Sequence, residues 1–183
     1  IYKLANSENL DGLISWGSTI GGSVSVEELN RFHQAFEPLP YVTIGHKMQN
    51  HSCVQFDAYT GMKELVHHFI KKHGSRRIAF LRGPETHVSA GERYRAFMDA
   101  LAEENLLTDD YPKLITDPFL WTEGEDAIIQ LHEKRKLVPG HDYDTLIGSS
   151  DLMLFSAVRY LQRYGFRIPQ DVRVAAFNDS AES

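Results

Sequence analysis

The chain has 183 residues, of which 42% are hydrophobic, so it is long enough to bury a core as one domain or as two small lobes. Its formal net charge of -6 argues against direct binding to nucleic acid or to an anionic membrane, and no apolar run reaches the roughly 20 residues that a membrane span needs. A single cysteine, Cys53, excludes an internal disulfide framework and, with no signal-peptide pattern, leads us to expect a cytoplasmic protein.

Strands and helices alternate along the chain. Short apolar runs predict strands at residues 12–16, 41–45, 53–56, 78–81, 114–115, 145–148 and 172–177. Apolar residues spaced three and four apart predict helices at residues 25–36, 61–73, 91–104, 123–134 and 151–164. Strands separated by helices pair in parallel, because a parallel connection needs a long crossover. The alternation therefore predicts an α/β fold of parallel sheets flanked by helices.

The closing stretch of the chain puts polar residues at the end of a strand. The apolar run at 172–177 is typical of a strand covered on both faces. Asn178, Asp179 and Ser180 follow it directly. Because open α/β sheets bind ligands at the carboxyl ends of their strands, these residues mark a candidate binding site. The preceding helix has apolar residues at helical spacing, which are Leu152, Phe155, Val158 and Leu161.

Three segments carry a resemblance to a known family. They are VQFDAYTGMKELVHHFIKKHGSRRIAFLRGPE at 54–85, SAGERYRAFMDAL at 89–101 and SSDLMLFSAVRYLQRYGFRIPQDVRVAAFNDS at 149–180. Together with DGLISW near the start, they resemble the ligand-sensing domain of the lactose and galactose repressor (LacI/GalR) family in order and spacing. The resemblance implies a periplasmic-binding-protein-like fold, in which two lobes of parallel sheet are joined by three crossovers and hold the ligand between them.

The resemblance also implies how the chain is divided. Residues 1–54 would form a partial first lobe, and residues 55–183 a nearly complete second lobe that lacks the final return to the first. By this comparison the unit is incomplete at both ends. The sequence shows no internal repeat and no low-complexity linker, so the boundary rests on the resemblance.

Two candidate ligand contacts flank the turn into a helix. In the family a serine and an arginine follow the RIAFLRG-like strand, and Ser89 and Arg93 occupy those positions. An arginine presents a rigid fork of donors that suits paired hydroxyls or a carboxylate. The alternative is that Arg93 is an ordinary helix residue that pairs with Glu92 or Asp99.

Two further candidates lie in loops. Trp121 stands where the family places an aromatic residue against the ligand ring, and an indole offers a flat face and one donor. Its alternative role is packing against the helix at 123–134. Asp57 falls near an acidic position at the first crossover, and it could equally cap the helix that starts at Gly61.

At the two closing strands the sequence departs from the family. Family members often have Ala-Asn-Asp before the last helix, whereas this chain has Ser-Ser-Asp at 149–151. The usual Gly-Phe-Asp-Asp or Gly-Tyr-Asp-Asp becomes Ala-Phe-Asn-Asp at 176–179. Ser150 and Asn178 are therefore the candidate contacts here. An amide that accepts and donates replaces a carboxylate that accepts from sugar hydroxyls, so a different polar ligand becomes possible.

Catalytic and metal sites find no support in the sequence. GSTIGGS places Gly17 and Gly22 as in a phosphate-binding loop, but Ser23 stands where the lysine is needed. No HExxH, zinc-spaced Cys/His pattern or GxSxG elbow occurs, and Cys53 reads as a small core residue of an apolar strand. We expect no metal, no cofactor and no enzymatic activity.

The sequence thus predicts a non-enzymatic sensor for a small polar ligand, possibly a sugar, whose lobes close on binding. In the family such domains form homodimers and regulate transcription, and DNA would be bound by a helix-turn-helix module outside these residues. Alternatives are the same sensing domain attached to a histidine kinase or diguanylate cyclase, and a free periplasmic binding protein of a transporter. An enzyme on a doubly wound sheet is disfavoured.

Overall fold

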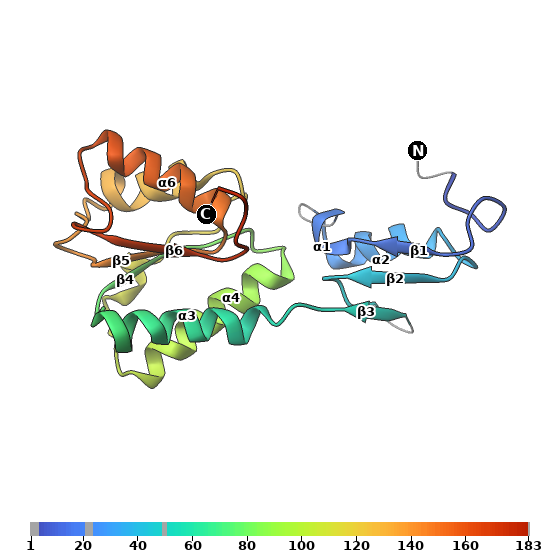
Figure 1. The fold of residues 1–183 in the computed structure, drawn as a ribbon, viewed down its shortest axis with the longest axis horizontal. Helices are drawn as coiled ribbons and strands as arrows, with labels where there is room; N and C mark the ends of the chain where they lie inside the picture. The colour runs from blue at the N-terminus through green and yellow to red at the C-terminus, as the bar shows by residue number, and fades with distance from the viewer. Residues whose placement is uncertain (1–3, 21–23, 49–50, 183) are drawn as a thin grey trace. The chain divides into compact units, whose positions relative to one another are not determined.

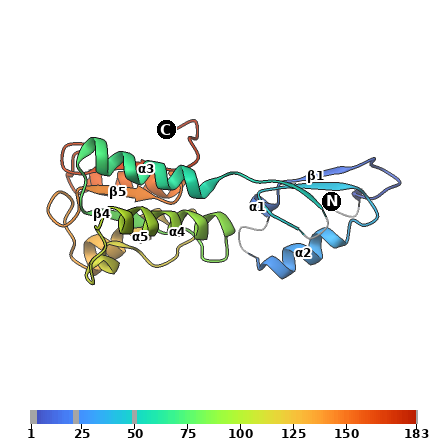
Figure 2. The same ribbon diagram turned by 90° about the horizontal axis from the view of Figure 1, so that it is seen from below.

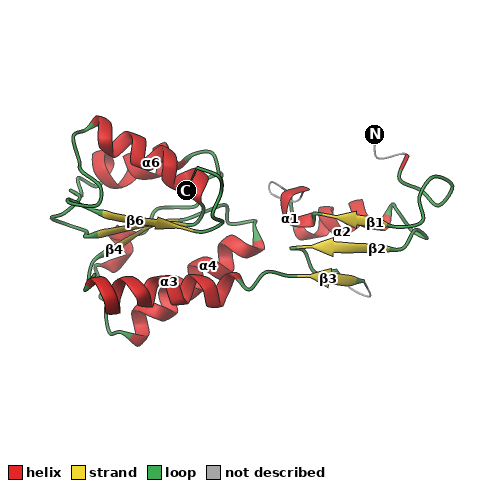
Figure 3. Cartoon of the chain, in the orientation of Figure 1, coloured by secondary structure: helices red, strands yellow, loops and turns green. Residues whose placement is uncertain are grey.

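The computed structural model describes residues 4–20, 24–48 and 51–182, in which helices and strands alternate as predicted (Figure 1 and Figure 3). The chain separates into two compact units, residues 1–57 with 86–89, and residues 58–85 with 90–183. Each unit contains a three-stranded sheet, and all strand pairs in both sheets are parallel. The predicted fold class is confirmed, whereas the lobe boundary at residues 54 and 55 stays a prediction.

The first unit has the strand order β1-β2-β3, and α2 lies along one face of this sheet (Figure 2). A capping box starts α2, because the Ser25 side chain accepts from the Glu28 N–H while the Glu28 side chain accepts from the Ser25 N–H. The elements are β1 (Leu13–Ser15), α1 (Gly17–Ile20), α2 (Val26–Gln34), β2 (Tyr41–Ile44) and β3 (Ser52–Val54).

Two predictions for the first unit concern Cys53 and the glycine-rich segment. Cys53 was expected in the core, but it is half-exposed in the short strand β3, where its Sγ donates to the His46 carbonyl at 3.2 Å. Gly17 opens α1, whereas Gly22 and Ser23 of the glycine-rich segment lie outside the described residues.

The second unit has the strand order β4-β5-β6, with α6 on one face of the sheet and α3 and α4 on the other (Figure 1). Its strands are β4 (Ile78–Leu81), β5 (Thr145–Gly148) and β6 (Arg173–Ala176). Its helical segments are α3 (Ala58–His73), α4 (Val88–Glu103), the 3-10 turn η2 (Tyr111–Leu114), α5 (Gly124–Ile129), the π-helical turn η3 (Gln130–Lys134) and α6 (Asp151–Arg163).

The core of the second unit forms where the sheet meets its helices. Every residue of β4 and β5 is buried, as expected for strands covered on both faces. The Phe80 ring of β4 stacks on the Phe97 ring of α4, with 4.5 Å between the ring centroids. The helix α3 turns one side to this core, since Met62, Val66 and Ile70 are buried.

In α6 the apolar residues at helical spacing coincide only in part with the buried face of the helix. Leu152 is 54% exposed, and Phe155 and Val158 are only partly buried. The face that packs inward consists of Met153, Leu154, Ala157, Tyr160 and Leu161. Aliphatic residues therefore share the contact with Ala157 and Tyr160, and Ser150 caps the helix by accepting from the Met153 N–H.

Two strand predictions were also wrong in detail. β6 is half-buried along its whole length, whereas the apolar run predicted a strand covered on both faces. The strand predicted at 114–115 is absent. Pro112 lies at the start of the turn η2, which ends at Leu114, and Ile115 forms a single bridge to Phe80.

No helix within the described ranges is both long and apolar enough to cross a membrane.

Candidate functional site

Three loops of the second unit meet at the carboxyl edge of its sheet. They follow Leu81 of β4, Gly148 of β5 and Ala176 of β6. The Ser149 N–H donates to the Leu81 carbonyl at 2.9 Å, and the Asp151 N–H donates to the Phe177 carbonyl at 3.0 Å. These backbone bonds extend the parallel pairing by one step and bring the polar residues of the loops together, as expected for a ligand site in an open α/β sheet.

Arg93 of α4 ties two of these loops together. Its Nη1 donates to the Ser149 carbonyl at 2.7 Å, and its Nη2 donates to Asn178 Oδ1 at 3.1 Å. The guanidinium carbon lies 4.1 Å from the centre of the Phe177 ring and 5.9 Å from that of Trp121. Arg93 is therefore not an ordinary helix residue with partners along α4, because its partners are on the loops after β5 and β6.

The charged guanidinium group of Arg93 is buried. The side chain is only 8% exposed, and burial lowers its pKa to about 10, against the opposing charges of Asp151 and Glu92. It stays protonated at neutral pH. Its Nε has no hydrogen-bond partner among the described residues.

Asp151 fixes the loop after β6 to the start of α6. Its Oδ1 accepts from the Leu152 N–H and its Oδ2 from the Ser180 N–H, both at 2.8 Å. Burial opposes ionisation of this carboxyl, but hydrogen bonds from Ser180, Leu152 and Asn178 outweigh it and lower the pKa of Asp151. The sequence analysis did not include Asp151 among the candidate contacts.

The loop after β6 has an unusual backbone. Asn178 has a φ of 111° and Asp179 a φ of 54°, both in the left-handed half of the map that most side chains avoid. Asparagine and aspartate tolerate such angles better than other residues with a side chain. The hydrogen bonds to Arg93 and Asp151 hold this loop, and such backbone angles are common at binding sites.

Trp121 lies over a glycine of the loop after β4. A Cβ atom built on Gly83 would be 2.5 Å from the Trp121 ring, so the indole rests directly on the Gly83 backbone. The ring is half-buried against the core of the second unit, and the Arg93 guanidinium is a further neighbour. Trp121 thus lies at the candidate site, and its contact with a ligand stays a prediction.

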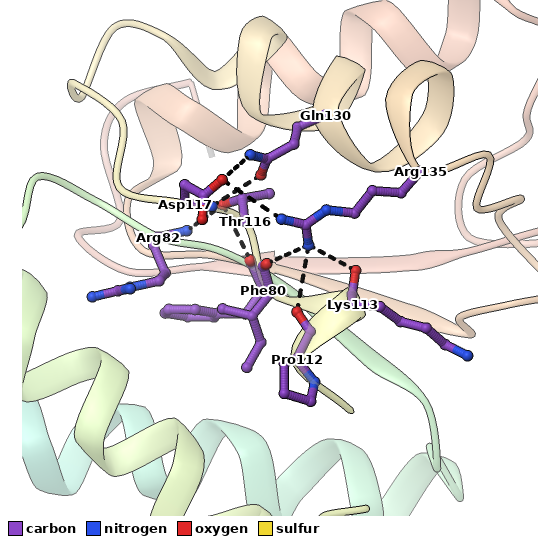
Figure 4. A network of polar contacts seen from close by, with 9 residues as sticks. Phe80, Arg82, Pro112, Lys113, Thr116, Asp117, Gln130 and Arg135 are labelled. Atoms are coloured by element: carbon purple, nitrogen blue, oxygen red, sulfur yellow. Dashed lines mark hydrogen bonds and ion pairs between the residues drawn. The ribbon is translucent and has the colours of Figure 1, made fainter. Parts of the chain in front are cut away.

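A polar network holds the segment that leads to Trp121 (Figure 4). Gln130 of η3 accepts from the Asp117 N–H at 2.9 Å, and its amide nitrogen donates to the Asp117 carboxylate. Thr116 Oγ1 accepts from the Arg82 N–H at 2.9 Å. The Arg135 guanidinium donates to the carbonyls of Pro112, Lys113 and Ile115.

The six predicted contacts fall into two groups. Arg93, Trp121 and Asn178 come together at the sheet edge of the second unit, and the buried Ser150 lies beside them as the cap of α6. Ser89, in the first turn of α4, and the exposed Asp57, directly before α3, belong to the first unit by their contacts. Their roles stay predictions.

Within residues 4–20, 24–48 and 51–182, no cluster of three or more histidine, cysteine, aspartate or glutamate side chains could hold an ion.

Comparison with known proteins identifies the family. The family model described as the periplasmic binding protein-like domain matches residues 66–183, well over half of the chain. The chain belongs to this family. A curated relative, the HTH-type transcriptional regulator CelR of Thermobifida fusca, is 30% identical over 146 residues, which cover 78% of this chain and 41% of CelR. The GalR regulator of Lacticaseibacillus casei is 27% identical and aligns with 96% of this chain and 51% of its own length.

Solved structures agree with this assignment. A complex of the regulator CelR with cellobiose has a TM-score of 0.75 and 27% identity, covering 97% of this chain and 51% of that one. A LacI-family sugar-binding regulator of Escherichia coli, complexed with phosphate, has a TM-score of 0.69 and 27% identity, covering 86% and 55%. The resemblance to LacI/GalR-type regulators is therefore confirmed. The chain spans about half or less of the length of these curated relatives.

Proposed function

We propose that this chain is the ligand-sensing domain of a bacterial LacI/GalR-type transcriptional regulator, which acts in the cytoplasm and catalyses no reaction. The observation that carries the proposal is the cluster of Arg93, Trp121 and Asn178 at the carboxyl edge of the β4-β5-β6 sheet. The cluster combines charged donors, a flat aromatic face and an amide, a set suited to a small polar ring. The regulators among the relatives favour a transcriptional output over a kinase, a cyclase or a transporter.

Each proposed contact has a separate role. Arg93 donates to ligand oxygens, Trp121 stacks on the ring, and Asn178 fixes its orientation by accepting and donating. Ser89, Ser150 and Asp57 are proposed as further polar contacts. The proposed lobes are residues 1–54 and 55–183, and ligand binding would alter the output by moving one lobe against the other.

The proposed partners follow from the relatives. Several are named as helix-turn-helix regulators, so we propose that DNA is bound by a module outside these residues and that the protein forms homodimers. Size-exclusion chromatography with light scattering on the full-length protein tests the dimer, and a monomer at micromolar concentration would contradict it.

The ligand proposal is tested by thermal unfolding of the full-length protein with a panel of neutral sugars, including cellobiose, and of sugar acids and sugar phosphates. A ligand at about 100 times its Kd should stabilise the folded protein by about 2.7 kcal/mol, which is a measurable rise in Tm. The shift should shrink in Trp121→Ala and stay unchanged in Tyr164→Ala, which removes an exposed aromatic ring outside the cluster. If no compound in the panel raises Tm, the sugar-sensing proposal is wrong.

A further inference from the structure

The proposed site also contains information about the charge of its ligand. We propose that the ligand is an anion, a sugar-like molecule with a carboxylate or phosphate group that binds Arg93, rather than a neutral sugar. This inference rests on the proposed function, because it names the ligand class of the same site. It follows from the immediate surroundings of Arg93.

The direct neighbours of the Arg93 guanidinium are all uncharged. They are the Ser149 carbonyl, the Asn178 amide oxygen and the rings of Phe177 and Trp121. Aromatic faces attract a cation but do not neutralise it. No carboxylate forms an ion pair with Arg93 in the described part of the chain, although arginine is rarely this buried without one.

The acidic residues near Arg93 are engaged elsewhere or lack a direct contact with it. The Asp151 carboxylate accepts hydrogen bonds from Leu152, Ser180 and Asn178, and its charge acts on Arg93 through space without a described ion pair. Glu92 is adjacent in α4, and its charge raises the pKa of Arg93 through space without forming an ion pair. The exposed Asp179 forms no described ion pair either.

Asn178 is the residue that leaves the charge unmatched. Its amide oxygen accepts from Arg93 as a carboxylate would, but it adds no negative charge. An aspartate at this position would form a charge-assisted pair with the guanidinium and leave it attractive mainly to hydroxyl groups. With asparagine, the charge is available to an oxyanion.

Arg93 also has donors left for such a group. A guanidinium has five N–H donors. In Arg93 the atoms Nη1 and Nη2 each make one described hydrogen bond, and Nε makes none. Ser149, whose carbonyl accepts from Arg93, has a side-chain Oγ that is buried and likewise without a described partner. Buried polar atoms are nearly always satisfied, so two unpaired atoms in residues that hydrogen-bond each other favour a further polar partner at this place.

The test is isothermal titration of the full-length protein with matched pairs that differ only in charge. The pairs are galactose with galacturonate and glucose with glucuronate or glucose 6-phosphate, and inorganic phosphate is titrated alone. At least one anionic member should bind about tenfold or more tighter than its neutral partner, since a charged group strengthens a hydrogen bond by this order. The carboxylate and phosphate arms distinguish the two sources of negative charge.

Asn178→Asp is the decisive variant. It should weaken binding of the anion by about tenfold or more, because it supplies the missing negative charge, and the affinity for the neutral partner should stay the same or rise. Asn105→Asp is the matched control, since Asn105 is an exposed residue with a φ of 55° beyond the far end of α4. It makes the same change of charge and should leave both affinities unchanged.

A second measurement does not depend on the variant folding. In the wild-type protein, the advantage of the anion should shrink when NaCl is raised from about 0.05 to about 0.5 M, whereas neutral binding should not change. Tighter binding of a neutral sugar than of its anionic partner would overturn this inference and leave the proposed function standing. If neither member of any pair binds, the proposed function fails and the inference with it.

Discussion

Arg93 Nη2 donates to Asn178 Oδ1 at 3.1 Å, a hydrogen bond between residues that lie 85 positions apart in the chain. The same guanidinium reaches the Ser149 carbonyl, so one side chain of α4 connects the loops that follow β5 and β6. Because the polar edge of the sheet depends on this residue, the candidate site and the stability of the second unit are linked.

Replacing Arg93 with lysine should therefore destabilise the protein as well as weaken ligand binding. An ammonium keeps the charge but lacks the planar fork that reaches both acceptors, and an unpaired buried acceptor costs about 1–3 kcal/mol. Urea unfolding should show a loss of this size. Arg95→Lys is the control, because Arg95 is an exposed neighbour whose guanidinium lies over the Tyr59 ring. If both variants unfold alike, Arg93 does not hold the loops.

Gly83→Ala should displace the Trp121 indole. The new methyl group would lie 2.5 Å from the ring, which is far inside van der Waals contact, so the ring has to move. The second tryptophan, Trp16, is 55% exposed, and a Trp16→Phe background isolates the Trp121 fluorescence. Emission should shift and acrylamide quenching should increase. The control Gly91→Ala adds a methyl group with nothing within 4 Å, and an identical spectrum in both variants would contradict the contact.

Most elements could be predicted where local pattern and tertiary environment agree. β4 and β5 have the predicted bounds, because each is a short, mostly apolar run that ends where polar or turn residues begin. The pattern misled where a pair of apolar residues was too short to distinguish a strand from a turn, as at Leu114 and Ile115 after Pro112. In α6 the apolar spacing coincides with the buried face only in part, since Leu161 is buried and Leu152 is exposed, while Ala157 and Tyr160 add to the contact.

The site could be predicted only in part, for a physical reason. The resemblance singled out Arg93, Trp121 and Asn178, which the structure brings together. Their contacts depend on tertiary structure, because Ser149 is 56 residues away from Arg93. The role of Asp151 was missed for the same reason: an acid at a helix start looks like a cap, and its bond to Ser180 forms only when β6 is in place.

Gly124→Ala should be strongly destabilising. A Cβ atom on this buried residue at the start of α5 would be 1.9 Å from the Met153 carbonyl oxygen of α6, so the two helices could not keep their present contact. The obstacle is backbone rather than a flexible side chain, and overpacking of this kind costs about 3 kcal/mol. Chemical denaturation followed by circular dichroism measures the loss. By contrast, Gly91→Ala at an exposed position of α4 should gain up to about 1 kcal/mol from helix propensity.

The first unit should lose stability in mild acid. Burial, together with the charge of His33, lowers the pKa of His46, which is 5% exposed. A histidine with a lowered pKa in the folded state takes up protons more readily when unfolded, so stability falls as the pH drops through about 6.5. Carboxylates with lowered pKa values, such as Glu28, lose their contribution only nearer pH 4.

The urea midpoint reported by Trp16, which follows β1, should therefore be lower at about pH 5.5 than at about pH 7.5. His46→Gln should reduce this difference, because glutamine cannot titrate and can still donate to Asn30 Oδ1, which lies 3.0 Å from His46 Nε2. An unchanged difference in His46→Gln would assign the acid sensitivity to other groups.

Arg135→Met should loosen the segment before Trp121. Arg135 Nη1 donates to the Ile115 carbonyl at 2.6 Å and to the Lys113 carbonyl at 2.9 Å, and methionine keeps much of the length without any donor. Each lost bond removes about 1 kcal/mol, so a fall of about 2 kcal/mol in unfolding free energy is expected.

Hydrogen exchange separates this local effect from a general one. Amides at residues 112–117 should exchange faster in Arg135→Met. The exchange rates of amides in β4 and β5, which are fully buried, should change only as far as the global stability changes. The control Lys134→Met changes the preceding, exposed residue of the same turn η3. Because the 112–117 segment leads into Trp121, increased quenching of its fluorescence in Arg135→Met alone would show that the network positions the indole. Equal exchange at these amides in the two variants would instead mean that Arg135 adds nothing to the order of this segment.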